Sequence, residues 1–136
     1  MAFLQWDDSL SVNIKEIDNQ HANLIEMANN LHNSLKAGQG NNILRPLLNS
    51  LVEYAITHFA TEEKWMKKYN YPELIQHKQE HQTFISEIKN FINKYKERTP
   101  LLAREILLYL GSWYRKHIIE NDKMFGKFLE KNKINL

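Results

Sequence analysis

Hydrophobic residues recur through most of this chain at the spacing of an α-helix, and turn residues divide the pattern into four long segments. The first segment carries a seam of residues spaced alternately by four and three positions: Ile17, His21, Leu24, Ala28, Leu31 and Leu35. This is the repeat of an amphipathic helix with one buried face. Comparable seams begin at Leu44, Leu74 and Leu102. The pattern predicts helices over about 17–37, 42–69, 73–95 and 100–131, preceded by an N-terminal arm over 1–16.

Turn and cap residues set the expected helix boundaries. A glycine of the 38–40 stretch is expected to take the left-handed conformation that ends the first helix. One asparagine of the pair at 41–42 is the expected N-cap of the second helix, and Thr99 followed by Pro100 is that of the fourth. Four long helices with short connections predict an all-α fold. We expect one domain over 1–136, an antiparallel up-down-up-down four-helix bundle with Trp6 of the arm packed on its body.

Polar side chains interrupt the hydrophobic seams at seven positions: His21, His58, Glu62, His77, His81, His117 and Asp122. Within each of the two pairs His58/Glu62 and His77/His81, the residues lie four positions apart and therefore face the same side of a helix. In an antiparallel bundle the start of one helix lies level with the end of the next, so all seven converge at one end of the core. Burying this set without compensation would cost several kcal/mol for each group. The sequence therefore predicts a metal site.

The spacing between His117 and Asp122 breaks the helical repeat. Five residues turn an ideal α-helix by roughly 140° beyond one revolution, so the two side chains would diverge. One additional residue accommodated in a π-helical turn would bring them to the same face, and such turns are frequent at functional sites. We predict a one-residue π-bulge between 117 and 122.

The predicted ligands limit the choice of metal. Seven are too many for one tetrahedral zinc ion, whereas calcium and magnesium prefer oxygen ligands. Imidazole combined with carboxylate suits a pair of iron or manganese ions. Of twelve positions on two octahedral ions, the histidines fill five, two bridging carboxylates fill four, and a bridging oxo or hydroxo group fills two. One position stays open for a small ligand.

Composition narrows the functional classes. The 136 residues include no cysteine, which excludes disulfides, thiolate metal sites and iron–sulfur clusters. With 18 basic and 16 acidic residues the net charge is +2, so we expect no dedicated nucleic-acid surface. No apolar run reaches the length of a membrane span, and the first residues lack the basic start of a secretory signal. We therefore expect no membrane insertion and a cytoplasmic location.

Several motifs follow one another along nearly the whole chain: the Trp6 arm, Ile17-Asp18-Asn19-Gln20-His21, His58-Phe59-x-x-Glu62-Glu63-x-x-Met66, Tyr71-Pro72, His77-x-x-x-His81 and Trp113-x-x-x-His117-Ile118-x-x-x-Asp122. In this order and at these spacings, they resemble the hemerythrin family, and in particular its single-domain bacterial members. The resemblance implies two Fe ions bridged by an oxo or hydroxo group, Glu62 and Asp122. It assigns His77, His81 and His117 to one iron. It assigns His21 and His58 to the other, which keeps the open position.

The resemblance also implies an apolar pocket for O2 beside the open position. The residues that match family pocket positions are Leu24, Phe59, Trp113 and Ile118. Tyr114 is a further candidate, at a position where the family often has leucine. Its hydroxyl could bond the bound ligand, or its ring could pack at a helix interface.

The expected function is reversible O2 binding, for carriage, storage or delivery, by a binding protein rather than an enzyme. An O2-consuming protein is a candidate recipient. One alternative is a di-iron enzyme that reduces peroxide or nitric oxide, although no separate acid–base side chain stands out, and a weak side activity is compatible with either function. Another is O2 or redox sensing through a separate partner. Three other residues receive structural interpretations. His32 is too far along its helix from His21 to share its metal, Glu63 is expected to be solvated, and Met66 is expected to fill the core.

Overall fold

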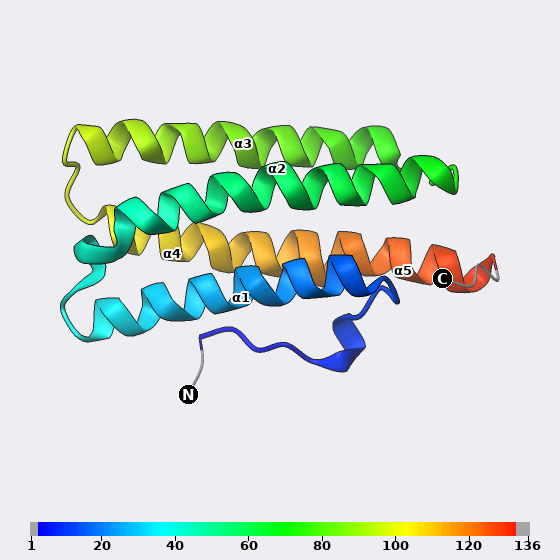
Figure 1. The fold of residues 1–136 in the computed structure, drawn as a ribbon, viewed down its shortest axis with the longest axis horizontal. Helices are drawn as coiled ribbons and strands as arrows, with labels where there is room; N and C mark the ends of the chain where they lie inside the picture. The colour runs from blue at the N-terminus through cyan, green and yellow to red at the C-terminus, as the bar shows by residue number, and fades with distance from the viewer. Residues whose placement is uncertain (1–2, 133–136) are drawn as a thin grey trace.

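Four antiparallel rods of helix form the body of the protein (Figure 1). The computed structural model describes residues 3–132, which contain helices and connecting turns and no strand within that range. The long helices are α1 (Lys15–Lys36), α2 (Leu44–Lys68), α3 (Leu74–Lys96) and α4 (Leu102–Trp113). The fourth rod continues from α4 through the π-helix η3 (Tyr114–Asp122) into α5 (Lys123–Lys131). Short 3₁₀ turns, η1 (Asp8–Leu10) and η2 (Gly40–Ile43), precede α1 and α2.

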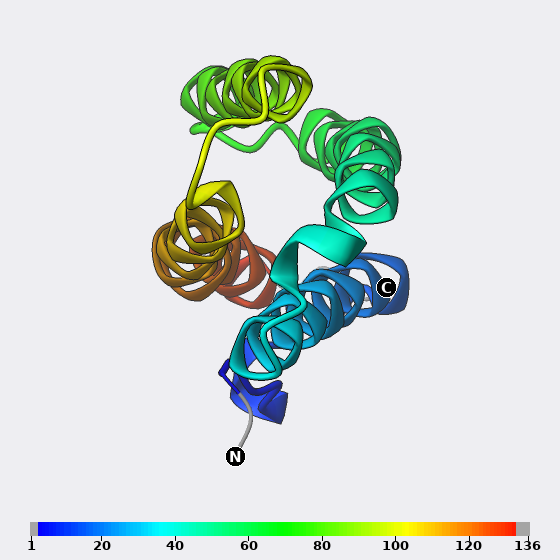
Figure 2. The same ribbon diagram turned by 90° about the vertical axis from the view of Figure 1, so that its left-hand side faces the viewer.

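The rods surround a common core, which the end-on view shows most clearly (Figure 2). Helix α1 packs against α2 and α4, and α3 packs against the same two helices from the other side. Each rod runs opposite to the one before it in the chain (Figure 1). The predicted all-α, up-down-up-down bundle is confirmed. The rods also begin and end within a few residues of the predicted boundaries, because the hydrophobic repeat that marks each helix is also the face that it buries.

The core consists of two apolar clusters with a polar layer between them. The larger cluster contains Leu31, Leu51, Phe84 and Leu110, all fully buried. The smaller cluster is formed by Val12, Ile14, Ile17, Met66, Tyr71, Phe125 and Leu129. Along each rod, the predicted metal ligands lie between residues of the two clusters. Apolar side chains therefore close the polar layer on both sides.

The N-terminal arm packs along the bundle and is held by specific hydrogen bonds. The Leu4 amide donates to Asn29 Oδ1 at 2.7 Å, and Asn29 Nδ2 donates back to the Leu4 carbonyl at 2.8 Å. At the start of α1, the Asp18 carboxylate accepts the Val12 amide at 2.9 Å. Trp6 is partly buried against the larger cluster, which confirms its expected packing.

Two predicted helix caps are wrong, whereas the glycine at the end of α1 is confirmed. Gly38 takes a positive φ of 73° just after α1. The expected asparagine N-cap of α2 is replaced by η2, and Ile43 then precedes the helix without a side-chain cap. Helix α4 begins at Leu102 rather than at Pro100, because Leu101 has a left-handed backbone with φ of 62°. That conformation interrupts the helical path between Pro100 and Leu102.

The π-helical turn predicted near 117–122 is confirmed, and it extends further towards the N-terminus. The backbone has π-helical hydrogen bonding from Tyr114 to Asp122. As a result His117 and Asp122 both face the core, and both are buried although they are five positions apart in the sequence. Among residues 3–132, no helix is long and apolar enough to cross a membrane.

Candidate metal centre

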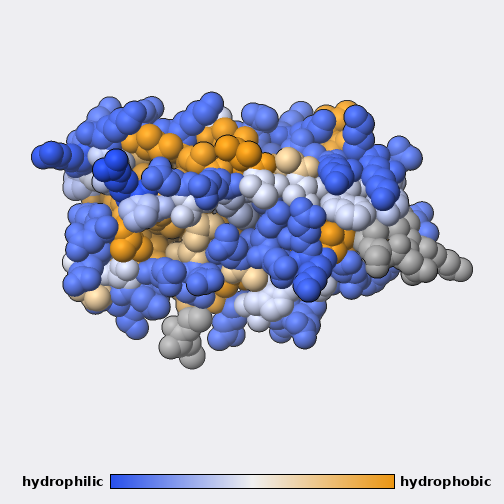
Figure 3. Space-filling view, viewed as in Figure 1, coloured by the Kyte–Doolittle hydropathy of each residue, from blue (hydrophilic) through white to orange (hydrophobic). Residues whose placement is uncertain are grey.

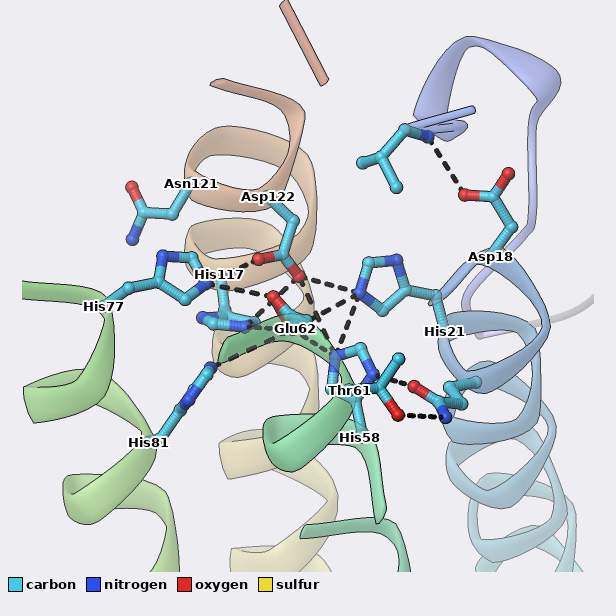
Figure 4. Close-up of polar contacts among 12 residues, drawn as sticks. Asp18, His21, His58, Thr61, Glu62, His77, His81, His117, Asn121 and Asp122 are labelled. Carbon is cyan, nitrogen blue, oxygen red and sulfur yellow. Dashed lines mark hydrogen bonds and ion pairs between the residues drawn. The ribbon is translucent and has the colours of Figure 1, made fainter. Parts of the chain in front are cut away.

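The seven predicted ligands meet in one buried cluster at the level of the polar layer (Figure 4). Helix α1 contributes His21, α2 contributes His58 and Glu62, α3 contributes His77 and His81, and η3 contributes His117 and Asp122. Each is at most 3% exposed. All four rods thus contribute to one cluster, as predicted, although it lies between two apolar clusters rather than at an end of the core.

One group of ligand atoms comes from His21, His58, Glu62 and Asp122, and these atoms all lie within 4.8 Å of one another. His21 Nε2 is 2.7 Å from Asp122 Oδ2 and 3.1 Å from His58 Nε2. His58 Nε2 contacts Glu62 Oε1 one helical turn away. Two imidazoles and two carboxylates thus point at a common space.

A second group of ligand atoms, from Glu62, His77, His81 and His117, meets the same limit of 4.8 Å. Glu62 Oε2 is 3.0 Å from His77 Nε2, and Oε1 is 3.2 Å from His117 Nε2. Glu62 belongs to both groups. Asp122 also reaches both, since its Oδ1 is 2.7 Å from His77 Nε2 while its Oδ2 approaches His21. The carboxylates of Glu62 and Asp122 therefore each contact histidines of both ligand groups.

The unsatisfied atoms of the cluster fit a pair of bound cations. His81 Nε2 and both Asp122 oxygens are buried without an aligned hydrogen bond, although the Asp122 oxygens lie 2.7 Å from ring nitrogens of His21 and His77. Buried polar atoms in proteins are nearly always satisfied. Metal coordination requires lone pairs that point at a common space, and these atoms have that arrangement. Imidazole and carboxylate are also the donors that iron or manganese prefers.

The imidazoles and the two carboxylates of the cluster shift one another's pKa values. Burial alone would lower the pKa of His21 and His77, but Asp122 and Glu62 outweigh it and raise each pKa to about 9. Burial would raise the pKa of Glu62, and the nearby His58 and His117 instead hold it well below its usual range. In contrast, burial dominates at His81 and lowers its pKa to about 3. The site thus favours positive charge between its carboxylates.

Three of the five histidines use their outward nitrogen, Nδ1, to contact a second side chain. His81 Nδ1 is 2.7 Å from Glu63 Oε2, and His117 Nδ1 is 3.0 Å from Glu80 Oε1. His58 Nδ1 is instead 2.7 Å from the amide oxygen of Gln20. Each of these partner atoms is an oxygen that accepts hydrogen bonds, so Nδ1 is the donor in all three contacts. These contacts orient the rings and fix their tautomers.

The sequence interpretation missed these outer partners. Glu63, expected to be solvated, is only 30% exposed in its side chain and bonds His81, so that expectation is wrong. Glu80 also accepts two hydrogen bonds at 2.7 Å from Asn121 Nδ2, which fixes its position. Each of Gln20, Glu63 and Glu80 is adjacent in sequence to a predicted ligand, and that adjacency is the signal that could have found them.

An aromatic layer borders the cluster on the side of the larger core. Phe59 stacks on His81 with ring centroids 3.9 Å apart, and Trp113 stacks on His117 at 4.0 Å. Tyr54, which the sequence interpretation did not single out, stacks on His58 at 4.9 Å. The other two predicted pocket residues, Leu24 and Ile118, are fully buried in the larger apolar cluster, which also contains Phe59.

The structure places the hydroxyl of Tyr114 on the N-terminal arm rather than in the predicted pocket. Its hydroxyl donates to the Gln5 carbonyl of the arm at 2.8 Å, and its ring is half-buried at the helix surface. The first residue of η3 thus faces the arm, away from the ligands. His32 stacks on Phe3 at 5.1 Å, and Met66 is fully buried, so both structural expectations are confirmed.

This architecture defines a class of protein: a four-helix bundle whose core contains two overlapping, histidine-rich groups of side chains that could each hold a metal ion. Among families of known proteins, the Hemerythrin HHE cation binding domain matches residues 12–129. The chain belongs to the hemerythrin family. Family and fold together support a di-iron, oxygen-binding protein.

Individual relatives agree with this assignment. The chain is similar to bacteriohemerythrin of Stenotrophomonas maltophilia, with 31% identity over 93% of this chain and 81% of the relative. It is 31% identical to bacteriohemerythrin of Clostridium acetobutylicum over 88% of this chain and 96% of the relative. A crystal structure of a hemerythrin point mutant superposes with a TM-score of 0.81 at 26% identity, covering 93% of this chain and 97% of that one.

Proposed function

We propose that this protein binds O2 reversibly at two iron ions held by the buried cluster. His77, His81 and His117 would hold one iron, and His21 and His58 would hold the other. Glu62 and Asp122 would bridge the two, together with an oxo or hydroxo group. When bound there, two ferrous ions would supply the two electrons that O2 takes up on binding and returns on release. The coordination count leaves one position open on the iron of His21 and His58.

The sharing of Glu62 between two compact ligand groups is the observation that supports the proposal most strongly. Glu62 is fully buried, and its two oxygens approach histidines of both groups. A mononuclear site would need only one of these groups. The second group would then leave buried, unsatisfied imidazoles, which are costly in an apolar core.

The residues around the cluster favour binding over turnover. The predicted pocket residues Leu24, Phe59, Trp113 and Ile118 are aliphatic or aromatic and at most 8% exposed. Such side chains exclude water and limit delivery of protons to a bound ligand. Among them, no side chain is suited to general acid–base catalysis. Reversible binding is therefore favoured over reduction of peroxide or nitric oxide.

The proposal is tested by loading the protein with Fe(II) under nitrogen and then exposing it to air. We expect a visible absorption band to appear with O2, to vanish on purging, and to return over several cycles, with two irons per chain. Irreversible bleaching with catalytic consumption of peroxide would instead favour an enzyme. A sensor would bind reversibly but alter its affinity for a separate partner.

A matched pair of variants ties the band to the cluster. His58→Ala should lower the iron content and abolish the reversible band. His32→Ala removes a histidine from the same bundle, where it stacks on Phe3, and should leave both unchanged. An unaltered spectrum in His58→Ala would refute the ligand assignment.

A further inference from the structure

The two proposed metal positions differ in the side chains that their histidines contact on the outside. Two of the three histidines in the Glu62, His77, His81 and His117 group donate to carboxylates, at 2.7 Å for His81 and 3.0 Å for His117. In the other group, His58 donates to an amide oxygen at 2.7 Å, and the buried Nδ1 of His21 has no partner among the described residues. The negatively charged outer partners therefore all belong to the histidines of one group.

The amide of Gln20 is fixed with its oxygen towards His58. Its Nε2 donates to Thr61 Oγ1 at 3.2 Å. The Thr61 hydroxyl in turn bonds the Thr57 carbonyl at 2.8 Å and lies 3.2 Å from a Glu16 oxygen. Since both ends of the amide have matched partners, the neutral acceptor on His58 follows from the hydrogen-bond network.

The carboxylate partners are partly shielded from solvent, and one of them is anchored by a further side chain. The side chain of Glu80 is 21% exposed and that of Glu63 is 30% exposed, so neither charge is fully screened by water. Asn121 anchors both oxygens of Glu80 at 2.7 Å. A carboxylate that accepts the Nδ1 hydrogen makes the opposite nitrogen a stronger donor to a metal, whereas an amide does so less. The added negative charge also stabilises the ion of higher charge.

We infer that the partners of the ligands make the two metal positions unequal. The position of His77, His81 and His117 retains iron more firmly and holds the ferric state more readily. The position of His21 and His58 is the one that loses its iron first. Gln20, Glu63 and Glu80 are positioning residues in this account, because they act through the imidazoles. The inference rests on the proposed di-iron site but not on O2 binding.

Iron release to an Fe(II) chelator under nitrogen tests this inference without any use of O2. The diferrous protein should release its iron in two phases of one ion each. Because the positions also differ in their number of histidines, two phases alone do not decide the matter. The contrast between variants does.

Gln20→Glu gives His58 Nδ1 a carboxylate partner in place of the amide. It should slow the fast phase by about tenfold and leave the slow phase unchanged. Glu63→Gln should accelerate the slow phase by about tenfold without altering the fast one. Glu53→Gln removes a carboxylate from an exposed position of the same helix and should change neither phase. Circular dichroism confirms that each variant is folded.

The inference is overturned if Gln20→Glu and Glu63→Gln leave both phases as in the parent protein, or if each variant shifts both phases equally. A variant that is folded but loads a single iron still reports one phase, and the rate of that phase supports or refutes the assignment. Loss of reversible O2 binding with these release patterns intact would overturn the proposed function alone.

Discussion

His117 Nε2 lies 3.2 Å from Asp122 Oδ2, although the two residues are five positions apart along one continuous rod. An α-helix would direct them to different faces. The π-helical backbone from Tyr114 to Asp122 turns both towards the core, where Asp122 reaches His77 and His21 with its two oxygens. The irregular segment therefore places Asp122 where, like Glu62, it contacts histidines of both ligand groups.

Asp122→Ala should reduce the iron content from two ions to one or fewer per chain. The substitution removes a proposed bridging ligand and leaves the buried His21 without its nearest counter-charge. Iron analysis after gel filtration measures the effect. Glu120→Ala, at an exposed position of the same π-helix, is the matched control and should retain both ions. Two firmly bound irons in Asp122→Ala would contradict the bridging role.

Removal of metal should destabilise the protein. The cluster buries five imidazoles and two carboxylates, and a cation that binds only the folded state stabilises it. Free metal at about 100 times its dissociation constant contributes about 2.7 kcal/mol, which corresponds to a melting temperature roughly 10 °C higher. Thermal unfolding followed by circular dichroism, before and after chelation, measures the shift.

Restoring iron to the chelated protein should return the original melting temperature. His58→Ala, which loses ligands for one ion, should show a smaller difference between its loaded and chelated forms. Equal melting temperatures for loaded and chelated parent protein would show that the cluster is stable without a cation.

The helices and the buried cluster of polar residues could be predicted because both follow from regular spacing. A residue on the buried seam is identified by its position in the repeat, and so is a polar residue that interrupts it. The π-helical turn was predictable on the same ground, since His117 and Asp122 both had to face inwards. These features depend on which face of a helix is buried, and the pattern of hydrophobic residues records that directly.

The outer partners and two of the caps were not predictable in this way. Glu63 and Glu80 lie just off the seam, where a carboxylate that bonds a ligand has the same sequence pattern as one in water. The start of α4 depends on the positive φ of 62° at Leu101, a conformation that leucine rarely takes and that no local motif signals. Features that depend on the exact rotation of a helix about its axis, or on a single backbone angle, therefore leave little trace in the sequence.

Trp113 lies between the predicted apolar pocket and a surface groove. Replacing its indole with a smaller side chain should admit water to the pocket. It is 8% exposed, stacks on His117 at 4.0 Å and lines a groove of about 220 Å³ together with Glu80 and Lys116. Its indole N–H also donates to the Tyr54 hydroxyl at 3.4 Å. Trp113→Phe removes that donor and leaves space beside the pocket.

For Trp113→Phe we expect the oxygenated protein to lose its reversible band in air about tenfold faster, because the apolar shell controls solvent access. The decay of the visible band over time is the measurement. Trp65→Phe is the control, since Trp65 stacks on Tyr69 at 6.0 Å beside the smaller cluster. Equal decay rates in the two variants would show that Trp113 does not shield the site.

Tyr114→Phe should change stability slightly and leave the metal site unaffected. The tyrosine hydroxyl donates to the Gln5 carbonyl at 2.8 Å and thereby ties η3 to the arm. Loss of that partly exposed hydrogen bond should lower the free energy of unfolding by about 0.5–1 kcal/mol, measured by denaturant titration. The reversible O2 band and the iron content should match those of the parent protein. A shifted band or a faster loss of O2 would mean that the hydroxyl reaches the ligand after all, and the assignment of Tyr114 to the arm contact would then fail.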